Sequence, residues 1–384
     1  MNELHKSVYI CYNYVHVSIR IIGEMICMDK ILYILEKYNC HLKRGEKSSA
    51  EFLKENFEEY IKDLKEALKP EDNTLVGERM CEMISEQMEN IEKNAKMLID
   101  VLELYNNGKI ISASQKAFEV FNNMKPQLMK RYSGFFRCET YYRLRVVNDV
   151  NSFPLERKEL FHIPSNKNYL VGTERYSMPG HPCLYLASQE VLTYYECGMP
   201  DKFAISKFDI PQCEENHMKF IDFSEKLIHL ANSFFCWFSN EKDKEKVRLY
   251  LLKHICTYPL RASCSLVAEH PGSKFIEEYI MPQLLLQWVM NDEDIDGIRY
   301  ESCKSSEKVK YLGGHNLVLV TKHFDKDGYD EKLRANIKVG TPMLFDKNNI
   351  TITPELKKVL DGRDIKDLPF YWGLQKAPDD FEII

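Results

Sequence analysis

The chain has 384 residues, enough for two domains or for one domain with large additions. Hydrophobic residues make up 44% of it and charged residues 29%, a composition that indicates a globular protein and excludes a disordered or fibrous one. The formal net charge of -6 argues against a protein that binds nucleic acid by neutralising phosphates, so neither DNA nor RNA is an expected partner.

The first element along the chain is an apolar segment at residues 8–28. A transmembrane helix needs about 20 mostly apolar residues, and four polar residues interrupt this run: Asn13, His16, Arg20 and Glu24. No basic region leads to a small-residue cleavage site, so we expect a buried helix or strand and neither a membrane span nor an export signal. Met25 and Met28 are alternative start positions, which makes residues 1–27 a candidate extension.

The N-terminal third is predicted to be helical. The segment SSAE at residues 48–51 is typical of a capping box, in which a serine oxygen accepts from free N–H groups and Glu51 reaches back. Apolar residues then recur at helical spacing from Phe52 to Leu68. Pro70 is expected to end this first helix.

A second predicted helix carries a methionine-rich apolar stripe from Met80 to Leu102 and ends at Asn107-Gly108, which is typical of a left-handed cap. The stripe is more typical of a core than of a partner-binding groove, which stays the alternative. A shorter helix is expected around Gln115–Asn122. Because no recognisable catalytic chemistry lies here, we interpret residues 1–131 as a helical module for scaffolding, regulation or partner binding.

The sequence pattern changes near Tyr132, where strand-like runs begin. Predicted strands cover Tyr141–Val147, Cys183–Leu186, Phe203–Phe208, Lys219–Asp222 and Leu317–Thr321. Predicted helices cover Glu190–Cys197, Lys244–Thr257 and Phe275–Asn291. Because strands and helices do not alternate regularly, we expect an α+β domain at residues 132–325. No GxGxxG motif follows a strand, which disfavours a Rossmann-type NAD site. Residues 326–384 are expected to form a C-terminal extension that packs on this domain and includes a short helix at Pro354–Leu360.

The 12 cysteines contain no CxxC pair and no regular spacing. In a chain of this size, scattered cysteines usually act as small buried hydrophobes. We therefore expect a reducing, cytoplasmic compartment and no zinc site.

Several sequence blocks between about residues 135 and 320 carry a resemblance: YYRLR, ELFHIP, RYSMPGHPCLYLAS, YYE, EEYIMPQLLLQW, IDGIRYES and GGHN. In these blocks and their order, the chain resembles the RES-domain proteins, a family named for Arg, Glu and Ser. The resemblance implies a fold similar to diphtheria-toxin-type ADP-ribosyltransferases and an NAD+-degrading activity. It also implies a toxin role, because many members are toxins paired with an Xre-type antitoxin.

Two arginines are the expected anion-binding residues. Arg143 in YYRLR matches the family's first arginine, and Arg175 in RYSMPG matches a second family position. A guanidinium presents a planar, permanently charged fork that suits a pyrophosphate. Arg145 lies on the same strand face as Arg143 by alternation and is the alternative for its role. Tyr142 is a further expected NAD+ contact.

The remaining expected site residues follow in the chain. The ring of Tyr185 could stack on nicotinamide or orient the ribose. Glu196 matches the family glutamate and could stabilise the oxocarbenium ion that forms as the nicotinamide bond breaks, hold ribose hydroxyls or activate the nucleophile. Glu190 is interpreted as a first-turn glutamate favoured by the helix dipole. Ser302 in GIRYES matches the family serine, expected to donate to a phosphate or to the nicotinamide amide, although Cys303 departs from the hydroxyl residue common there.

Two further polar positions receive structural interpretations. His162 in ELFHIP is expected to order its strand or loop and not to bind a metal, because neither HExxH nor a carboxylate pair surrounds it. His315 and Asn316 in GGHN are expected to form a turn before the last strand.

The leading hypothesis is therefore an NAD+-degrading enzyme without a cofactor, for which phosphate and water are alternative acceptors of ADP-ribose. Transfer of ADP-ribose to a protein is the alternative enzymatic activity. A catalytically silent, partner-binding module is the alternative from another class. The expected partners are NAD+, an antitoxin or regulatory protein, and a second copy of the chain.

Overall fold

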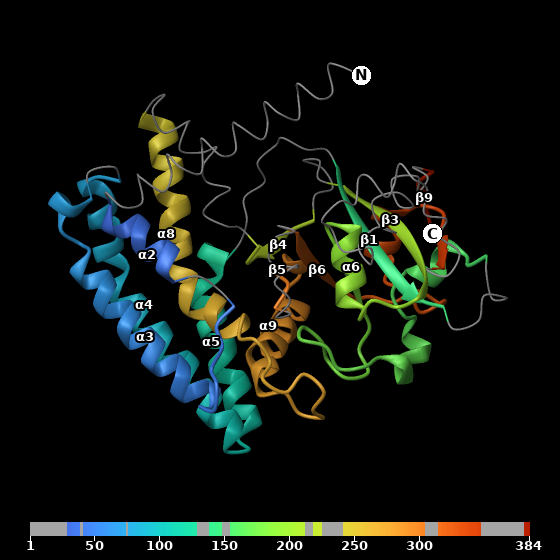
Figure 1. Cartoon of the computed structure of the whole chain (residues 1–384), viewed down its shortest axis with the longest axis horizontal. Helices are drawn as coiled ribbons and strands as arrows, with labels where there is room; N and C mark the ends of the chain where they lie inside the picture. Colours follow the sequence, from blue (N-terminus) through green and yellow to red (C-terminus); the bar gives the residue numbers. More distant parts are fainter. Residues whose placement is uncertain are drawn as a thin grey trace, which may run out of the picture. The chain divides into compact units, whose positions relative to one another are not determined.

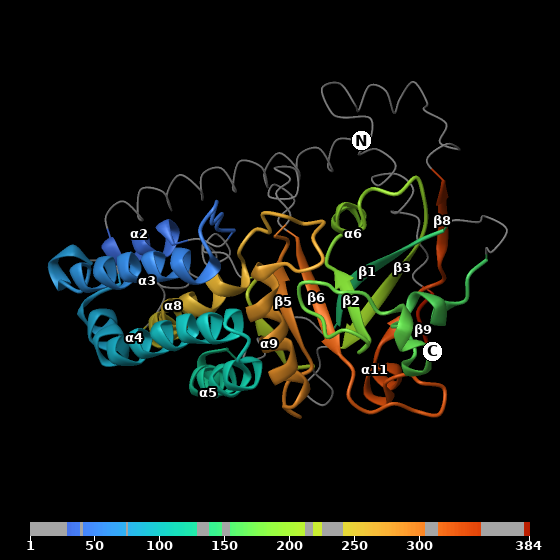
Figure 2. The same ribbon diagram turned by 90° about the horizontal axis from the view of Figure 1, so that it is seen from below.

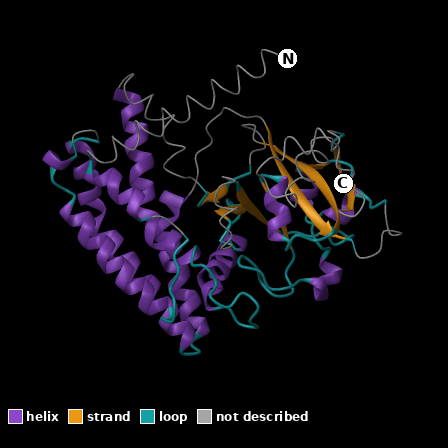
Figure 3. Ribbon diagram, in the orientation of Figure 1, coloured by secondary structure: helices purple, strands orange, loops and turns teal. Residues whose placement is uncertain are grey.

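The computed structural model describes residues 29–38, 41–73, 76–128, 138–147, 154–211, 218–224, 241–303, 314–346 and 380–384. The chain divides into two compact units, Met1–Leu128 with Glu225–Met281, and Met129–Ser224 with Pro282–Ile384. The described strands all belong to the second unit, whereas the first is helical (Figure 3). The α+β class predicted from the sequence is confirmed.

The first unit is built from α2 (Lys30–Lys37), α3 (Ser49–Glu66), α4 (Glu78–Asn106), α5 (Ile110–Leu128), α8 (Glu241–Cys264) and short 3₁₀ turns (Figure 1). The predicted capping box begins α3, because the Ser48 side chain accepts from the Glu51 N–H at 3.2 Å and the Glu51 carboxylate accepts from the Ser48 N–H at 3.0 Å. Gly108, with a φ of 75°, follows α4 as predicted. Met80, Met83 and Met97 are buried, so these methionines of the α4 stripe are core residues.

The division of the chain differs from the predicted one at α8. Residues 225–281 were expected in the same domain as the strands, yet they cluster with the N-terminal helices. The reason is aromatic packing inside the first unit: the Tyr60 hydroxyl donates to the Ile255 carbonyl at 2.8 Å, and the Tyr60 and Tyr258 rings lie 4.4 Å apart between centroids. None of the described helices is both long and apolar enough to span a membrane.

The second unit contains one mixed sheet in the order β4-β5-β6-β2-β1-β3-β7-β9, with β8 paired to β3 (Figures 1 and 2). Its strands are β1 (Cys138–Val146), β2 (Cys183–Ala187), β3 (Lys202–Pro211), β4 (Phe220–Asp222), β5 (Gly297–Glu301), β6 (His315–Val320), β7 (Lys338–Val339), β8 (Met343–Asp346) and β9 (Glu382–Ile383). The C-terminal residues therefore join the sheet through β7, β8 and β9. The predicted helix at Pro354–Leu360 and the apolar segment at 8–28 lie outside the described residues.

The sheet consists of two half-sheets joined at one position. Among the described residues, β1 and β2 pair only through Tyr142 and Ala187, whereas β1 pairs with β3 continuously from Cys138 to Val146. We call β4-β5-β6-β2 the first half-sheet and β1-β3 with β7, β8 and β9 the second. Figure 2 shows β1 and β3 inclined to β5 and β6.

Different elements cover the two faces of the sheet. On one face, which we call the α6 face, Tyr194 of α6 (Glu190–Glu196) packs in one cluster with Leu144 and Phe203. The opposite face, the α11 face, packs Tyr141 and Leu186 in a larger core with the 3₁₀ helix η3 (Arg157–Leu160) and with α11 (Glu331–Asn336). Because strand residues alternate between faces, each strand position can be assigned to one of the two.

A polar network on the α11 face links the half-sheets. Arg299 of β5 pairs with Asp222 of β4 at 3.4 Å and with Glu139 of β1. The Tyr141 hydroxyl donates to Glu139 at 3.0 Å and lies 3.0 Å from His315 Nε2. We call these five residues the Arg299 network. Since each half-sheet contributes charged partners, the network reinforces the single paired position between β1 and β2.

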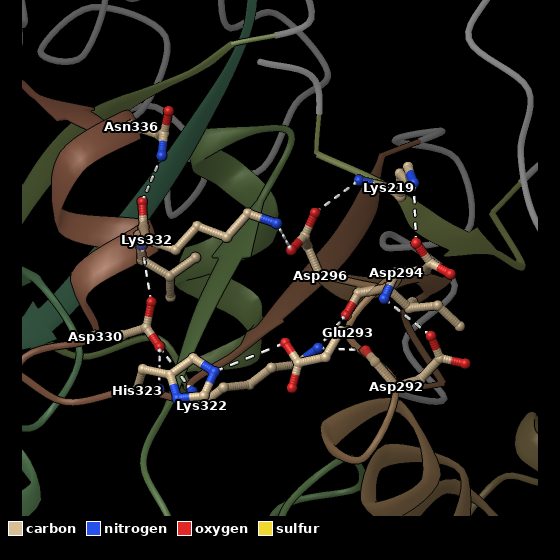
Figure 4. A network of polar contacts seen from close by, with 12 residues as sticks. Lys219, Asp292, Glu293, Asp294, Asp296, Lys322, His323, Asp330, Lys332 and Asn336 are labelled. Carbon is tan, nitrogen blue, oxygen red and sulfur yellow. Dashed lines mark hydrogen bonds and ion pairs between the residues drawn. The ribbon is translucent and has the colours of Figure 1, made fainter. Parts of the chain in front are cut away.

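A second polar network fixes the segment between β6 and α11 (Figure 4). Asp296 accepts from the Lys219 N–H at 3.0 Å and from the Lys332 ammonium. The Lys322 ammonium donates to two main-chain carbonyls, and burial lowers its pKa. Asp330, the N-cap of α11, accepts from the Lys322 N–H at 2.7 Å. These contacts are structural, since each charge is satisfied by the chain itself.

Candidate functional site

Glu196 is the last residue of α6 and is half-buried. The side-chain amide of Asn316, at the start of β6, donates to Glu196 Oε1 at 2.7 Å. Asn316 stands opposite Ala187 on β2 and Tyr300 on β5, so these residues share the α6 face. The structure therefore places Glu196 over the first half-sheet, at the end of α6.

Tyr300 brings Glu196 and Arg175 into one neighbourhood. Burial raises the pKa of Tyr300 well above its usual range, Glu196 adds to the rise, and Arg175 opposes it. The Tyr300 ring packs 4.5 Å from that of Tyr176, the residue after Arg175. Arg175 itself is 8% exposed. A carboxylate and a guanidinium that act on one phenol from different parts of the chain define a polar site.

Tyr185 of β2 fixes the loop that carries Arg175. Its hydroxyl donates to the Tyr176 carbonyl at 2.8 Å. Burial raises the pKa of Tyr185 well above its usual range, so the phenol is protonated at neutral pH. The hydroxyl is thus used by the loop, so any contact of Tyr185 with a ligand would be made through its ring.

Arg143 of β1 is a poorly compensated cation beside Tyr185. Its Nη1 atom is buried and has no hydrogen-bond partner among the residues that the structure describes. Burial lowers the pKa of Arg143 to about 10, and its electrostatic neighbours in the described part of the chain include Cys197, Arg145, Tyr185 and, on the α11 side, His162, none of which is a carboxylate. Cys197 directly follows Glu196, so Arg143 lies near the end of α6. A desolvated guanidinium without a counter-ion favours an anionic ligand.

Two of the expected NAD+ contacts are not brought into this arrangement. Arg145 is exposed, and its guanidinium donates to the Glu159 carbonyl at 2.7 Å. Tyr142 packs with Leu144 in the apolar cluster of the α6 face, whereas strand alternation starts the Arg143 side chain from the α11 face, the side of Tyr141. Of the two arginines that the sequence left as alternatives, Arg143 is the one whose charge acts on Tyr185.

Ser302 follows β5 and is 5% exposed. Continued alternation from Tyr300 places it toward the α6 face, the side of Glu196. The Cys303 thiol donates to the Glu301 carbonyl at 3.6 Å, and the residues after it lie outside the described part of the chain. Among the residues that are described, no three His, Cys, Asp or Glu side chains gather as a metal-binding group.

The sequence interpretation missed Tyr300 and Asn316 as parts of this site. Both belong to the blocks that carry the family resemblance, GIRYES and GGHN, which is the signal that could have identified them. Asn316 was expected in a turn but belongs to β6, because β2 and β5 pair on either side of it.

His162 orders the chain on the α11 side, as predicted. Its Nδ1–H donates to the Ile163 carbonyl at 2.9 Å, and its Nε2 accepts from the Asp330 N–H at 3.0 Å. Both contacts require the neutral ring. Burial is the main cause that lowers the pKa of His162 to about 4 from its ordinary 6.5.

This lowered pKa predicts a pH-dependent stability. Between pH 6.5 and pH 4 the unfolded chain binds a proton that folded His162 does not, so its contribution is complete above pH 6.5 and is lost as the pH falls toward 4. We expect the wild type to lose about 3 kcal/mol more over this window than His162→Gln, which cannot titrate. Urea unfolding at several pH values measures the difference. His323→Gln, at an exposed histidine, should show the same change in the free energy of unfolding with pH as the wild type. The same pH dependence in all three proteins would contradict the prediction.

The comparisons with known proteins add one relative. The chain is 25% identical over 333 residues to a protein of Bacillus subtilis (strain 168) named "Putative toxin YopC", an alignment that covers 83% of this chain and 71% of that protein. No family model matches the chain, and no solved structure matches it. The similarity thus extends over most of the chain and points to a toxin-like family.

Proposed function

We propose that this protein is an NAD+-degrading enzyme that cleaves the nicotinamide–ribose bond and passes ADP-ribose to phosphate or water. The observation that carries the proposal is the buried guanidinium of Arg143, whose Nη1 lacks a hydrogen-bond partner within the described chain and whose charge acts on Tyr185. Arg143 acts electrostatically on Tyr185 and on Cys197, the residue after Glu196, and buried Arg175 acts on Tyr300 together with Glu196. The resemblance to RES-domain proteins supports the same reading.

The proposed roles follow from this arrangement. Arg143 and Arg175 bind the pyrophosphate of NAD+. Its oxygens accept the hydrogen bonds that water no longer supplies to these buried guanidinium groups. The ring of Tyr185 contacts the nicotinamide riboside, and Ser302 donates to a phosphate or to the carboxamide. As the bond between ribose C1′ and the pyridinium nitrogen breaks, nicotinamide leaves with the electron pair and positive charge develops on the ribose. Glu196 stabilises that charge electrostatically.

The acceptor completes the reaction at C1′. Water gives ADP-ribose and releases a proton, whereas phosphate gives ADP-ribose 1′′-phosphate through a new bond to a phosphate oxygen. Both reactions require NAD+ to be bound in the same way, so one binding site can support hydrolysis or phosphorolysis.

The toxin-named relative supports a biological role for this reaction. Loss of NAD+ halts the redox reactions of a cell, so an NAD+-degrading enzyme can act as a toxin. We extend the proposal to that role on the basis of the relative that covers 83% of this chain.

Mass spectrometry of NAD+ incubated with the full chain tests the proposal. We expect release of nicotinamide in every sample, ADP-ribose without phosphate, and the phosphorylated product if phosphate is the acceptor. Label transferred from NAD+ to proteins of a lysate would indicate a protein acceptor instead. Intact NAD+ after prolonged incubation with folded protein would refute the assignment.

A further inference from the structure

We propose that Asn316 is the positioning residue for the Glu196 carboxylate, an inference that rests on the proposed function and deepens it. Asn316 is 5% exposed, and its Nδ2 donates to Glu196 Oε1 at 2.7 Å. The two residues lie 120 positions apart in the sequence. The contact therefore depends on the tertiary fold and not on local chain geometry.

The chemistry of the contact suits a positioning role. A buried side-chain amide must place its N–H groups on acceptors, and a donor to a carboxylate makes one of the stronger hydrogen bonds in a protein. Because the bond fixes Oε1, it sets the direction in which the carboxylate faces the substrate ribose, where positive charge develops.

Glu196 needs such a restraint because of its place in the chain. It ends α6, a helix of seven residues, and terminal helical turns are prone to fraying. Two exposed residues, Cys197 and Gly198, follow it. The helix end therefore holds the carboxylate less firmly than a contact to a central strand does.

Asn316 is itself held rigidly. β6 lies between β2 and β5, where Asn316 stands opposite Ala187 and Tyr300. The neighbouring His315 donates its N–H to Ser188 Oγ at 2.9 Å, and its ring contacts the Tyr141 hydroxyl at 3.0 Å. The start of β6 is therefore held by both neighbouring strands, by Ser188 and, on the α11 face, by Tyr141, so Asn316 is a rigid support for Glu196.

The test compares Asn316→Leu and Asn316→Asp in the full chain, with NAD+ as the probe. In Asn316→Leu the carboxylate loses its restraint, and we expect kcat to fall about 10²-fold, with KM changed far less. Asn316→Asp places a second carboxylate against Glu196, and two adjacent carboxylates share a proton. We therefore expect the acidic limb of its kcat/KM profile to move upward by about one pH unit or more.

The control is Asn336→Asp, since Asn336 lies on α11 and its amide donates to the Lys332 carbonyl at 2.7 Å. It should keep the wild-type profile. If both Asn316 variants lose activity only in proportion to their unfolded fraction, with an unshifted pH limb, Asn316 is merely structural and the inference fails. If the wild type turns over NAD+ and the Asn316 variants do so equally well, the inference alone fails. If the folded wild type does not turn over NAD+, the proposed function fails together with it.

Discussion

Replacement of Glu196 by Gln is expected to reduce nicotinamide release by roughly 10²–10⁴-fold, the range for a carboxylate that acts directly on the reacting group. Gln has nearly the same shape and keeps a carbonyl oxygen that can accept from Asn316, which donates to Oε1 at 2.7 Å in the wild type. The substitution therefore removes the charge while preserving the contact. Nicotinamide release and thermal unfolding, measured on the same sample, separate chemistry from folding.

The matched control for this prediction is Glu190→Gln, in the first turn of the same helix. Glu190 is interpreted as a helix-dipole residue, so its loss should leave turnover within a few-fold of the wild type. Equal activity of Glu196→Gln and the wild type in an assay free of contaminating NAD+ hydrolases would remove Glu196 from the mechanism. Host toxicity on expression, relieved by Glu196→Gln, would connect the reaction to the toxin role.

Arg143→Met should make the protein more stable and at the same time inactive. The guanidinium is desolvated and its Nη1 has no hydrogen-bond partner in the described part of the chain, so the folded state bears a cost that an apolar side chain of similar length avoids. We expect the free energy of unfolding to rise by about 1–3 kcal/mol. NAD+ turnover should fall by roughly 10²-fold or more, because one charge-assisted phosphate contact is lost.

The control is Arg145→Met, at an exposed arginine on the same strand. It should change the free energy of unfolding by less than about 0.5 kcal/mol. Inorganic pyrophosphate provides a second readout, since a ligand that binds only the folded state raises the unfolding temperature. It should stabilise the wild type and Arg145→Met but not Arg143→Met. Destabilisation of Arg143→Met with unchanged pyrophosphate binding would show that Arg143 is a structural residue.

Much of the secondary structure could be predicted because its signals are local. The capping box at Ser48 and the glycine at 108 marked helix ends, and the apolar runs of β2 and β6 marked buried strands. β5 escaped prediction because Arg299 lies at its centre, and only the tertiary network with Glu139 and Asp222 makes a buried arginine acceptable there.

The site was predictable only as far as its motifs extend. Arg175, Tyr185 and Glu196 were proposed from family blocks, and the structure brings them near one another through Tyr300. The choice between Arg143 and Arg145 could not be made from alternation, because it depends on which guanidinium lies next to Tyr185. The hydrogen-bond partner of Glu196 could not be predicted either, because Asn316 lies on a strand 120 residues away in the sequence.

The single paired position between β1 and β2 has a consequence for the lifetime of the protein. Under the proposed function, NAD+ contacts Arg143 on one half-sheet and Tyr185 on the other, so the bound substrate adds a cross-link to the paired position and the Arg299 network. Ligands that bind only the folded state suppress local opening and the proteolysis that follows it. An enzyme whose half-sheets are joined in part by its substrate becomes easier to degrade once it has consumed that substrate.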